Sequence, residues 1–127
     1  MDNENFNAEY KVGYKNLNTY KKADELVILI YKVTKNFPKE ELFGLVSQIR
    51  RCAVSIVANI VEGYGRRTNK DKAHFCFIAR GSLNELEYYI DLTHQLNYIN
   101  ATDYQELSQK RGDVGRLLSG LIKSFNK

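Results

Sequence analysis

The sequence predicts an all-α fold, an antiparallel up-down-up-down four-helix bundle, and three observations lead to this prediction. Apolar residues recur at intervals of three and four along four long stretches, as they do on one face of a helix. The connections between these stretches are short, which favours antiparallel neighbours. The chain of 127 residues contains a single proline, Pro38, so its composition permits long uninterrupted helices.

The length fits one domain, and the composition is that of an ordinary soluble globular protein. Residues 1–16 show no apolar period and predict a flexible leader, so the bundle domain is expected to span residues 17–127. The polar N-terminus does not look like a signal peptide, and no apolar run approaches the ~20 residues needed to cross a bilayer. We therefore expect a cytoplasmic protein without membrane contact, whose Cys52 and Cys76 are reduced packing residues.

The first helix is expected from about Thr19 to Asn36, with Thr19 or Asn18 as its N-cap. Pro38 stops this helix and opens a turn. Its core residues follow a spacing of four and three and are Ala23, Val27, Ile30, Thr34 and Phe37, widened by Leu26, Leu29 and Val33.

The second helix is expected from about Leu45 to Glu62. Its core stripe consists of Val46, Ile49, Ala53, Ile56 and Ile60. Three further valines, Val54, Val57 and Val61, extend the apolar arc to roughly half of the circumference, although a surface helix needs a stripe of only ~100°.

The third helix is expected from about Asn69 to Asn97. Its main core face consists of Phe75, Ile78, Ala79, Leu83, Leu86, Tyr89, Ile90 and Leu96. A second apolar strip runs beside this face and consists of Phe77, Gly81, Tyr88 and Leu92. One bundle needs only one apolar face per helix, so the second strip requires its own explanation.

The fourth helix is expected from about Asp103 to Phe125, and Thr102 with Gln105 fits a capping box. Its expected core residues are Leu107, Val114, Leu118, Leu121 and Phe125. A separate stripe consists of the small residues Ser108, Gly112, Gly115 and Ser119. Each glycine inside a helix costs up to ~1 kcal/mol relative to alanine, so the alternatives are close helix packing or a weak, fraying helix.

The surplus of apolar and small-residue surface predicts that the protein is not a monomer, because monomers rarely expose contiguous apolar patches larger than a few hundred Å². The residues expected at the interface between subunits are Phe77, Gly81, Tyr88, Leu92, Gly112 and Gly115.

A short basic elbow, residues 62–68, joins the second helix to the third. Its glycines, Gly63 and Gly65, are expected to end the second helix in a left-handed conformation, and Thr68 is expected to cap the third helix together with Asp71. Helix N-termini attract anions, so the elbow is a candidate site for RNA or DNA phosphates. The alternative is a solvated basic turn. The expected nucleic-acid-binding residues are Arg66, Arg67, Lys70 and Lys72, with Arg50 and Arg51 as further candidates.

Other polar residues on the helices are better explained by structure than by catalysis. Glu62 fits either a general base or an ion pair with Arg66 one turn later, and the ion pair is favoured. The two histidines, His74 and His94, stand too far apart on one helix for a shared metal site. We therefore expect no enzymatic activity, metal or cofactor, and a structural polar seam that consists of Asn59, Glu62, Arg80 and Glu85.

Two stretches, SIVANIVEGYGRR at 55–67 and IARGSLNELEYYIDL at 78–92, identify a family. With KADELV at 22–27 and Phe43-Gly44-Leu45 upstream, the chain resembles the four-helix-bundle proteins encoded by intervening sequences of bacterial large-subunit ribosomal RNA genes, which are classed as ribosomal-protein-like. The resemblance covers roughly residues 14–121. Val57 departs from it, because family members commonly have proline there.

The resemblance implies a ring-like homo-oligomer, with five as the preferred number of subunits. A related branch is the accessory protein of diversity-generating retroelements, which binds a reverse transcriptase and nucleic acid through a basic surface. Three hypotheses follow. The first is an oligomeric protein that binds RNA or DNA through the elbow. The second is a scaffold that binds a protein from a neighbouring gene without touching nucleic acid. The third, and least favoured, is a small-ligand or metal enzyme inside the bundle.

Overall fold

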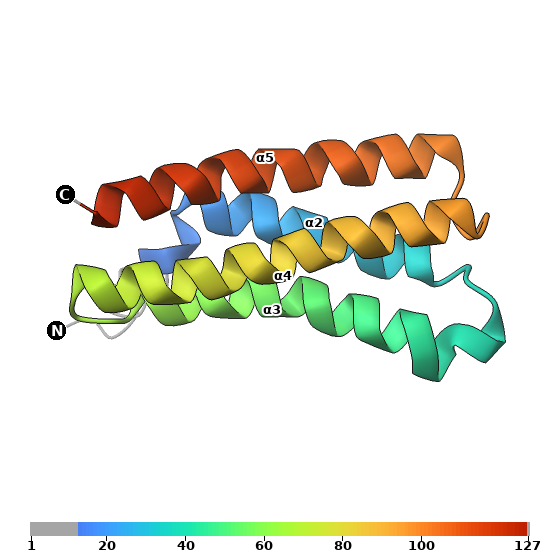
Figure 1. Ribbon diagram of the computed structural model, residues 1–127, viewed down its shortest axis with the longest axis horizontal. Helices are drawn as coiled ribbons and strands as arrows, with labels where there is room; N and C mark the ends of the chain where they lie inside the picture. The colour runs from blue at the N-terminus through green and yellow to red at the C-terminus, as the bar shows by residue number, and fades with distance from the viewer. Residues whose placement is uncertain (1–12, 127) are drawn as a thin grey trace, which may run out of the picture.

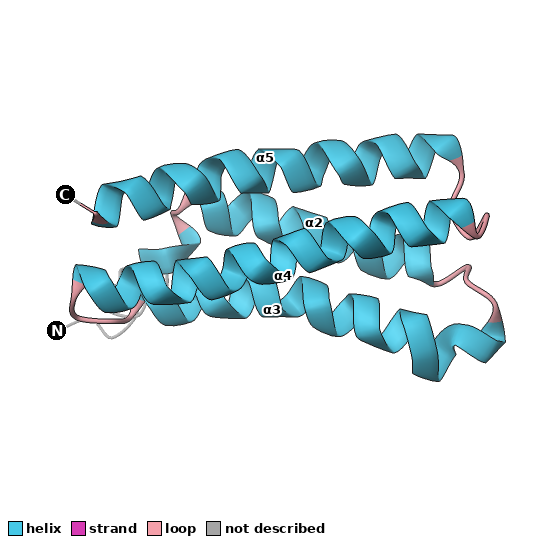
Figure 2. Cartoon of the chain, in the orientation of Figure 1, coloured by secondary structure: helices cyan, strands magenta, loops and turns pink. Residues whose placement is uncertain are grey.

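The computed structural model describes residues 13–126, and within this range the chain forms helices and no strand. Four long helices account for most of it (Figures 1 and 2). They are α2 (Asn18–Thr34), α3 (Ser47–Tyr64), α4 (Asn69–Gln95) and α5 (Ala101–Phe125). A 3₁₀ turn, η1 (Lys39–Glu41), and a π-helical turn, η2 (Leu42–Val46), precede α3. The helix bounds lie within two residues of those predicted from the sequence.

Successive long helices run in opposite directions, and α5 returns to lie against α2 (Figure 1). Each helix packs on its neighbours in the chain, with the most extensive contact between α3 and α4. The predicted all-α four-helix bundle is therefore confirmed. The elbow lies at the left-hand end in Figure 1, and the η1–η2 connection lies at the opposite end.

The core lies along the bundle axis and contains the residues expected from the helical periodicity on α2 and α3. Predictions for α4 and α5 were less accurate. Ile78 and Leu96 are exposed, whereas Ile122, which was not among the expected core residues, is buried. Cys52 and Cys76 are buried and free, as expected of packing residues. The long α4 turns its face gradually as it crosses the bundle, so a stripe drawn at uniform spacing drifts off the core near its ends. The fully buried large side chains include Leu26, Ile30, Ile56, Ile60, Leu83, Leu86, Leu107 and Leu118.

One of the three expected helix caps is present. The Thr68 hydroxyl accepts a hydrogen bond from Asp71 N at 3.1 Å and begins α4, as predicted. The other two predictions are wrong. Leu17 precedes α2 and makes no side-chain cap, and α5 begins at Asn100, whose Oδ1 accepts from Asp103 N at 2.7 Å. Asn100 replaces Thr102 because an earlier cap adds two residues to the helix.

Asn97 ends α4 in the left-handed conformation, with φ of 62°. The Tyr98 amide donates to the Thr93 carbonyl at 2.9 Å, and the Asn97 amide donates to the His94 carbonyl at 3.0 Å. These two bonds form a Schellman motif, which satisfies the last free carbonyls of the helix. A tight turn to α5 follows.

The expected leader, residues 1–16, lies mostly outside the described residues. For residues 13–16 the prediction is wrong, because they form a helical turn that packs on the bundle. The Tyr14 ring makes edge contacts with Tyr20, at 5.1 Å between ring centroids, and with Tyr64, at 6.4 Å. These contacts attach the start of the described chain to the end of α3.

By length and composition alone, the segment Lys39–Tyr64 is long and apolar enough to cross a membrane. The segment is not a continuous apolar run, because it includes Lys39, Glu40, Glu41, Arg50 and Arg51. The buried half of α3 packs in the bundle core, and core helices of soluble proteins pass the same test. The surplus valines explain the high hydropathy, since Val54 is exposed and Val57 and Val61 are half-buried.

Candidate functional site

The elbow is a compact turn between α3 and α4. Gly65 caps α3 with φ of −81°, and its amide donates to the Val61 carbonyl at 3.3 Å. The expected left-handed glycine is therefore wrong, because every described glycine has negative φ. Gly63 lies inside the last turn of α3 and is buried. Thr68 is the N-cap of α4. The first backbone amides of α4 have no partner within the helix, and they lie beside the basic side chains of the elbow.

Gly63 is required by a close approach of α3 to α4. A Cβ atom at this position would lie 3.1 Å from Phe75 Cβ and 3.2 Å from the carbonyl oxygen of Lys72. The Lys72 carbonyl is backbone in the first turns of α4 and cannot easily move. The glycine therefore fixes the distance between the two helices at the elbow.

Two of the four elbow cations are held against aromatic rings. The Arg66 guanidinium lies 4.5 Å from the Phe75 ring centroid and pairs with Glu62 at 3.6 Å. This ion pair confirms the preferred interpretation of Glu62. The Lys72 ammonium lies 5.9 Å from the Tyr64 ring and 5.8 Å from the Phe125 ring. Both side chains are thus positioned by contacts with aromatic rings of the bundle.

The other two elbow cations, Arg67 and Lys70, project into solvent. Both are exposed, and neither forms an ion pair with a described residue. Lys70 occupies the first turn of α4, where the helix dipole already favours anions. Of the predicted nucleic-acid-binding residues, these two are the best placed to contact a phosphate.

The fold places two further lysines, which the sequence analysis missed, at the same end of the bundle as the elbow. Lys123 lies in the last turn of α5, whose Phe125 contacts Lys72. Lys15 follows Tyr14, whose ring touches Tyr64. An antiparallel bundle with the elbow at one end must also place the start of its first helix and the end of its last helix there, so the predicted topology was the signal that could have found them.

Arg50 and Arg51 do not join the elbow. They lie near the start of α3, roughly 20 Å along the helix from Arg66 at ~1.5 Å per residue. Arg50 Nε donates to the Thr34 hydroxyl at 2.9 Å, and its guanidinium stacks 4.6 Å from the Tyr31 ring centroid. The structure thus separates the six candidates into two groups at opposite ends of the bundle.

The predicted polar seam of Asn59, Glu62, Arg80 and Glu85 is not one network. Asn59 donates to the Ser55 carbonyl on its own helix at 2.8 Å, and Arg80 stacks on the Phe77 ring at 4.9 Å. Two of the four join interhelical networks, and these networks are separate. Asn59 also donates to the Ser55 hydroxyl at 3.2 Å, which is hydrogen-bonded to Ser82 on α4. Glu85 accepts from Tyr89, which also reaches Gln48 on α3 at 3.0 Å.

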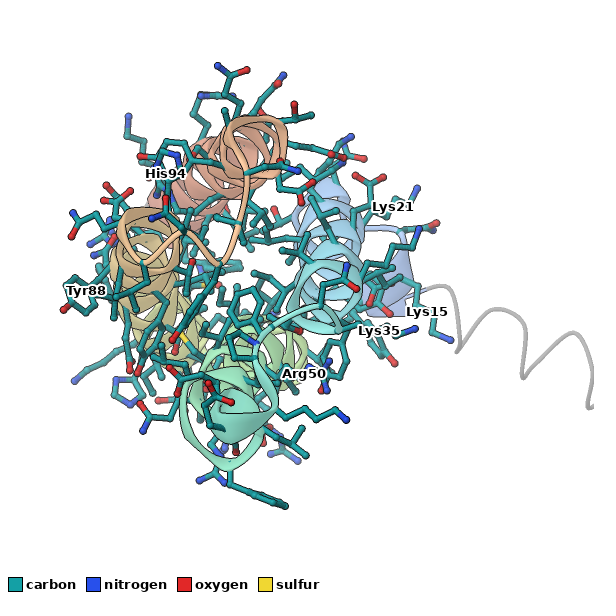
Figure 3. All side chains as sticks on the ribbon, turned by 90° about the vertical axis from the view of Figure 1, so that its right-hand side faces the viewer. Lys15, Lys21, Lys35, Arg50, Tyr88 and His94 are labelled. Atoms are coloured by element: carbon teal, nitrogen blue, oxygen red, sulfur yellow. The ribbon has the colours of Figure 1, made fainter. Side chains whose placement is uncertain are left out.

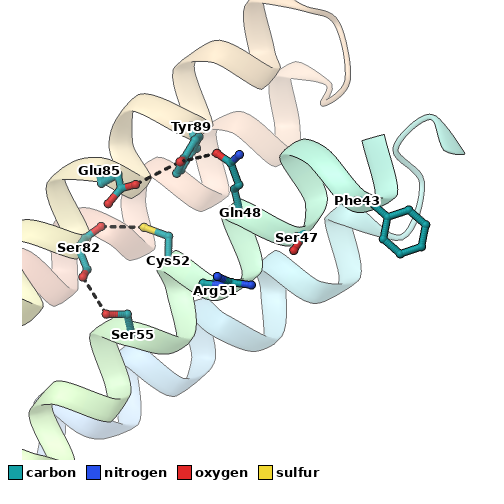
Figure 4. A pocket seen from close by; sticks show the side chains of 9 residues that line it. All are labelled: Phe43, Ser47, Gln48, Arg51, Cys52, Ser55, Ser82, Glu85 and Tyr89. Carbon is teal, nitrogen blue, oxygen red and sulfur yellow. Dashed lines mark hydrogen bonds between the residues drawn. The ribbon is translucent and has the colours of Figure 1, made fainter. Parts of the chain in front are cut away.

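A different line of polar contacts joins α3 to α4. Ser55 and Ser82 share a hydrogen bond of 2.9 Å, and the Cys52 thiol donates to the Ser82 carbonyl at 3.1 Å (Figure 4). Burial, with a smaller effect of Glu85, raises the pKa of Cys52 to about 12. The thiol therefore stays protonated at neutral pH and is not an activated nucleophile.

An open groove of about 600 Å³ runs over these contacts. Its walls come from α3 and α4, and Phe43 stands at its end (Figure 4). In residues 13–126 no group of three or more His, Cys, Asp or Glu side chains could hold a metal ion.

The second apolar strip of α4 is on the surface. Phe77 is 45% exposed and Tyr88 is 62% exposed, and Tyr88 points away from the bundle in Figure 3. A Cβ atom on Gly81 would meet no atom within 4 Å. Leu92 is half-buried. The strip therefore has no partner among the described residues along much of its length.

The small residues of α5 behave differently. A Cβ atom on Gly115 would lie 3.6 Å from Leu83 Cδ2 of α4, and one on Gly112 would lie 3.6 Å from the Arg116 side chain. Both glycines are half-buried. Gly115 thus lies at the contact between α4 and α5 within one chain. This contact accounts for a glycine at position 115 without a second subunit.

Comparison with known proteins gives consistent results. A family model described as 23S rRNA-intervening sequence protein matches residues 15–120. Among solved structures, the chain is similar to a protein of unknown function from the S23 ribosomal protein family of Bacteroides thetaiotaomicron. The two chains share 28% identity with a TM-score of 0.76, over 83% of this chain and 95% of the other. No curated protein matches this chain.

Proposed function

The chain belongs to the 23S rRNA-intervening sequence protein family, and from that premise we propose that it is a cytoplasmic, non-enzymatic oligomer that binds RNA through the elbow end of its bundle. The observation that carries the proposal is the pair of exposed cations, Arg67 and Lys70, at the N-terminus of α4. Phosphate oxygens accept hydrogen bonds from such side chains and from free helix amides.

The surroundings of these two residues support binding of a polyanion. Lys15 and Lys123 add positive charge from two other segments, while Arg66 and Lys72 hold theirs against aromatic rings. Two carboxylates lie nearby: Glu62 is paired with Arg66, and Asp71 follows Lys70 in the chain. The surface spans several helix ends, which suits a phosphate backbone better than a single small anion.

The chemistry of the elbow favours contact without base selection. Arg66 occupies a face of the Phe75 ring, and Tyr64, beside Lys72, is the one exposed aromatic ring at the elbow among the described residues, so they offer no row of rings on which bases could stack. Phosphate contacts set affinity and orientation and carry little sequence information. We therefore propose binding that depends on charge density and salt.

Assembly is the second part of the proposal. The exposed strip of Phe77, Gly81 and Tyr88 on α4 supports a contact between subunits, since it is apolar and, apart from the Arg80 guanidinium over the Phe77 ring, open in the described chain. Repeating the elbow around a closed ring, five-membered as the family resemblance implies, would multiply weak phosphate contacts on one long RNA. Linked sites bind with greater avidity than one site alone.

The proposal is tested by titrating a single-stranded RNA with the protein at several salt concentrations. Replacing both Arg67 and Lys70 with alanine should weaken binding of all RNA sequences alike. The slope of log affinity against log salt should become shallower by ~0.7 per lost contact in each bound subunit. The control is Lys35→Ala, which removes an exposed lysine at the end of the bundle opposite the elbow. Arg50→Ala is unsuitable because it breaks a hydrogen bond with Thr34. An unchanged slope in the folded double variant would exclude the elbow.

A further inference from the structure

Phe43 is the most exposed of the large apolar side chains in the described chain, at 93%. Leu42 is 50% exposed, and Tyr31 and Val54 are also exposed. We call these four residues, Tyr31, Leu42, Phe43 and Val54, the kink surface. They lie on the part of the bundle away from the elbow. Val54 belongs to the apolar arc of the second helix noted in the sequence, whereas the other three were not expected at an interface.

The backbone of η2 produces this exposure. Gly44 interrupts the helix with φ of −110° and ψ of −109°, and a Cβ there would lie 3.1 Å from Glu41 Oε1. The interruption directs Phe43 away from the bundle (Figure 4). Burying a phenylalanine side chain is favourable, and the described chain leaves this contribution unused at Phe43.

The kink surface lines a hollow of about 510 Å³, together with Val46, Ser47 and two arginines. Arg50 is fixed at one wall by its bond to Thr34 and its stacking on Tyr31. Arg51 is exposed and makes no ion pair with any described residue. No acidic residue lines this hollow. It is therefore an apolar hollow with a cationic rim.

The acidic residues around the hollow do not pair with Arg51. Glu85 lines the adjoining groove together with Arg51, but it accepts a hydrogen bond of 3.1 Å from Tyr89 and forms no ion pair with a described residue. The Glu41 carboxylate accepts a hydrogen bond of 2.9 Å from Tyr98, on the side of the α4–α5 connection. Glu40 is exposed in η1 and does not line the hollow. The Arg51 charge thus remains available to a ligand that enters beside Phe43.

We propose that the kink surface docks a short amphipathic segment of another protein, with an apolar anchor against Phe43 and a carboxylate on Arg51. Peptide grooves of this kind take one or two apolar anchors, and charge complementarity fixes their register. A buried aromatic anchor beside an arginine is also the composition typical of interface hot spots.

Two other occupants fit less well. Single-stranded nucleic acid stacks successive bases on aromatic faces. Here the Tyr31 ring faces Arg50, and Leu42 and Val54 are aliphatic, so Phe43 offers one free ring and no row of rings. A second copy would have to present an acidic apolar face. The exposed strip of α4 instead carries a cation, because the Arg80 guanidinium lies over the Phe77 ring. The docking proposal is independent of the proposed RNA contact, which lies at the other end of the molecule.

The test is a selection of short random peptides, displayed as a library, on the full-length protein. We expect the selected peptides to share an aromatic or aliphatic anchor flanked by Asp or Glu. Phe43→Ser should weaken their binding at least about ten-fold. Ile28→Ser, at an exposed apolar residue of α2 outside the kink surface, is the control and should leave binding unchanged. Arg51→Glu should disfavour acidic peptides and permit basic ones.

Both substitutions at the kink surface remove exposed atoms, so the variants should fold, and circular dichroism checks this. Three results would overturn the proposal. One is the absence of selected peptides whose binding depends on Phe43. Another is a fall in the molecular mass of Phe43→Ser, which would assign the surface to a second copy. The third is a loss of RNA affinity in Phe43→Ser, which would assign it to nucleic acid.

Discussion

Single residues explain the close contact at the elbow and the free surface on α4. Gly63 leaves room for the Lys72 carbonyl and for Phe75, whereas Gly81 and Gly120 face open space. Gly63 of α3 therefore has a packing role, whereas Gly81 of α4 and Gly120 of α5 have none within the described chain. A cost of up to ~1 kcal/mol for each glycine in a helix makes the difference measurable.

We expect Gly63→Ala to lower the free energy of unfolding by about 1–3 kcal/mol, because the added methyl would overlap backbone and a Cβ that cannot rotate away. Gly120→Ala is the matched control and should raise stability by up to ~1 kcal/mol. Chemical denaturation of the two variants measures both. If Gly63→Ala and Gly120→Ala changed the free energy of unfolding equally and in the same direction, the close approach of α3 to α4 would be contradicted.

At the scale of the elements, helix periodicity predicted the long helices well but their ends less well. The spacing of apolar residues identifies a face, and this spacing persists wherever a helix packs on one core. An N-cap depends on which of several nearby polar residues takes the extended conformation, and Asn100 competes with Thr102 for that place. The η2 kink depends on one glycine conformation at Gly44, which no periodicity reveals.

The cap of α5 gives a direct comparison. Asn100→Ala should lower the free energy of unfolding by ~1 kcal/mol, since the Asp103 amide loses its acceptor. Thr102→Ala, in the first turn of the same helix and exposed, should change it by no more than ~0.5 kcal/mol. Thermal unfolding of both variants makes the measurement. The reverse order of effects would place the cap at Thr102.

At the scale of the whole molecule, the elbow cations could be predicted from the sequence, but the different surroundings of each cation could not. Arg66 stacks on Phe75 from the next helix, and Lys72 reaches Phe125 from the far end of the chain. Such contacts depend on helix crossing and rotation, which local patterns do not determine. The separation of Arg51 from the elbow, in contrast, follows from helix length alone.

Assembly is predicted at this scale. Light scattering should give a mass above the 14.7 kDa of one chain. Tyr88→Glu should reduce this mass, because it places a charge in the centre of the exposed α4 strip, while Phe43→Ser should not. A wild-type mass of 14.7 kDa at micromolar concentration would refute the proposed oligomer.

The central claim is that RNA lies on the elbow end of the bundle, and lysine footprinting of the intact protein tests it most directly. Bound RNA should protect Lys70, Lys15 and Lys123 from an amine-reactive reagent, as read by mass spectrometry. It should leave Lys35 and Lys39, near the opposite end, fully reactive. Protection of Lys35 and Lys39 with an unprotected Lys70 would contradict the account.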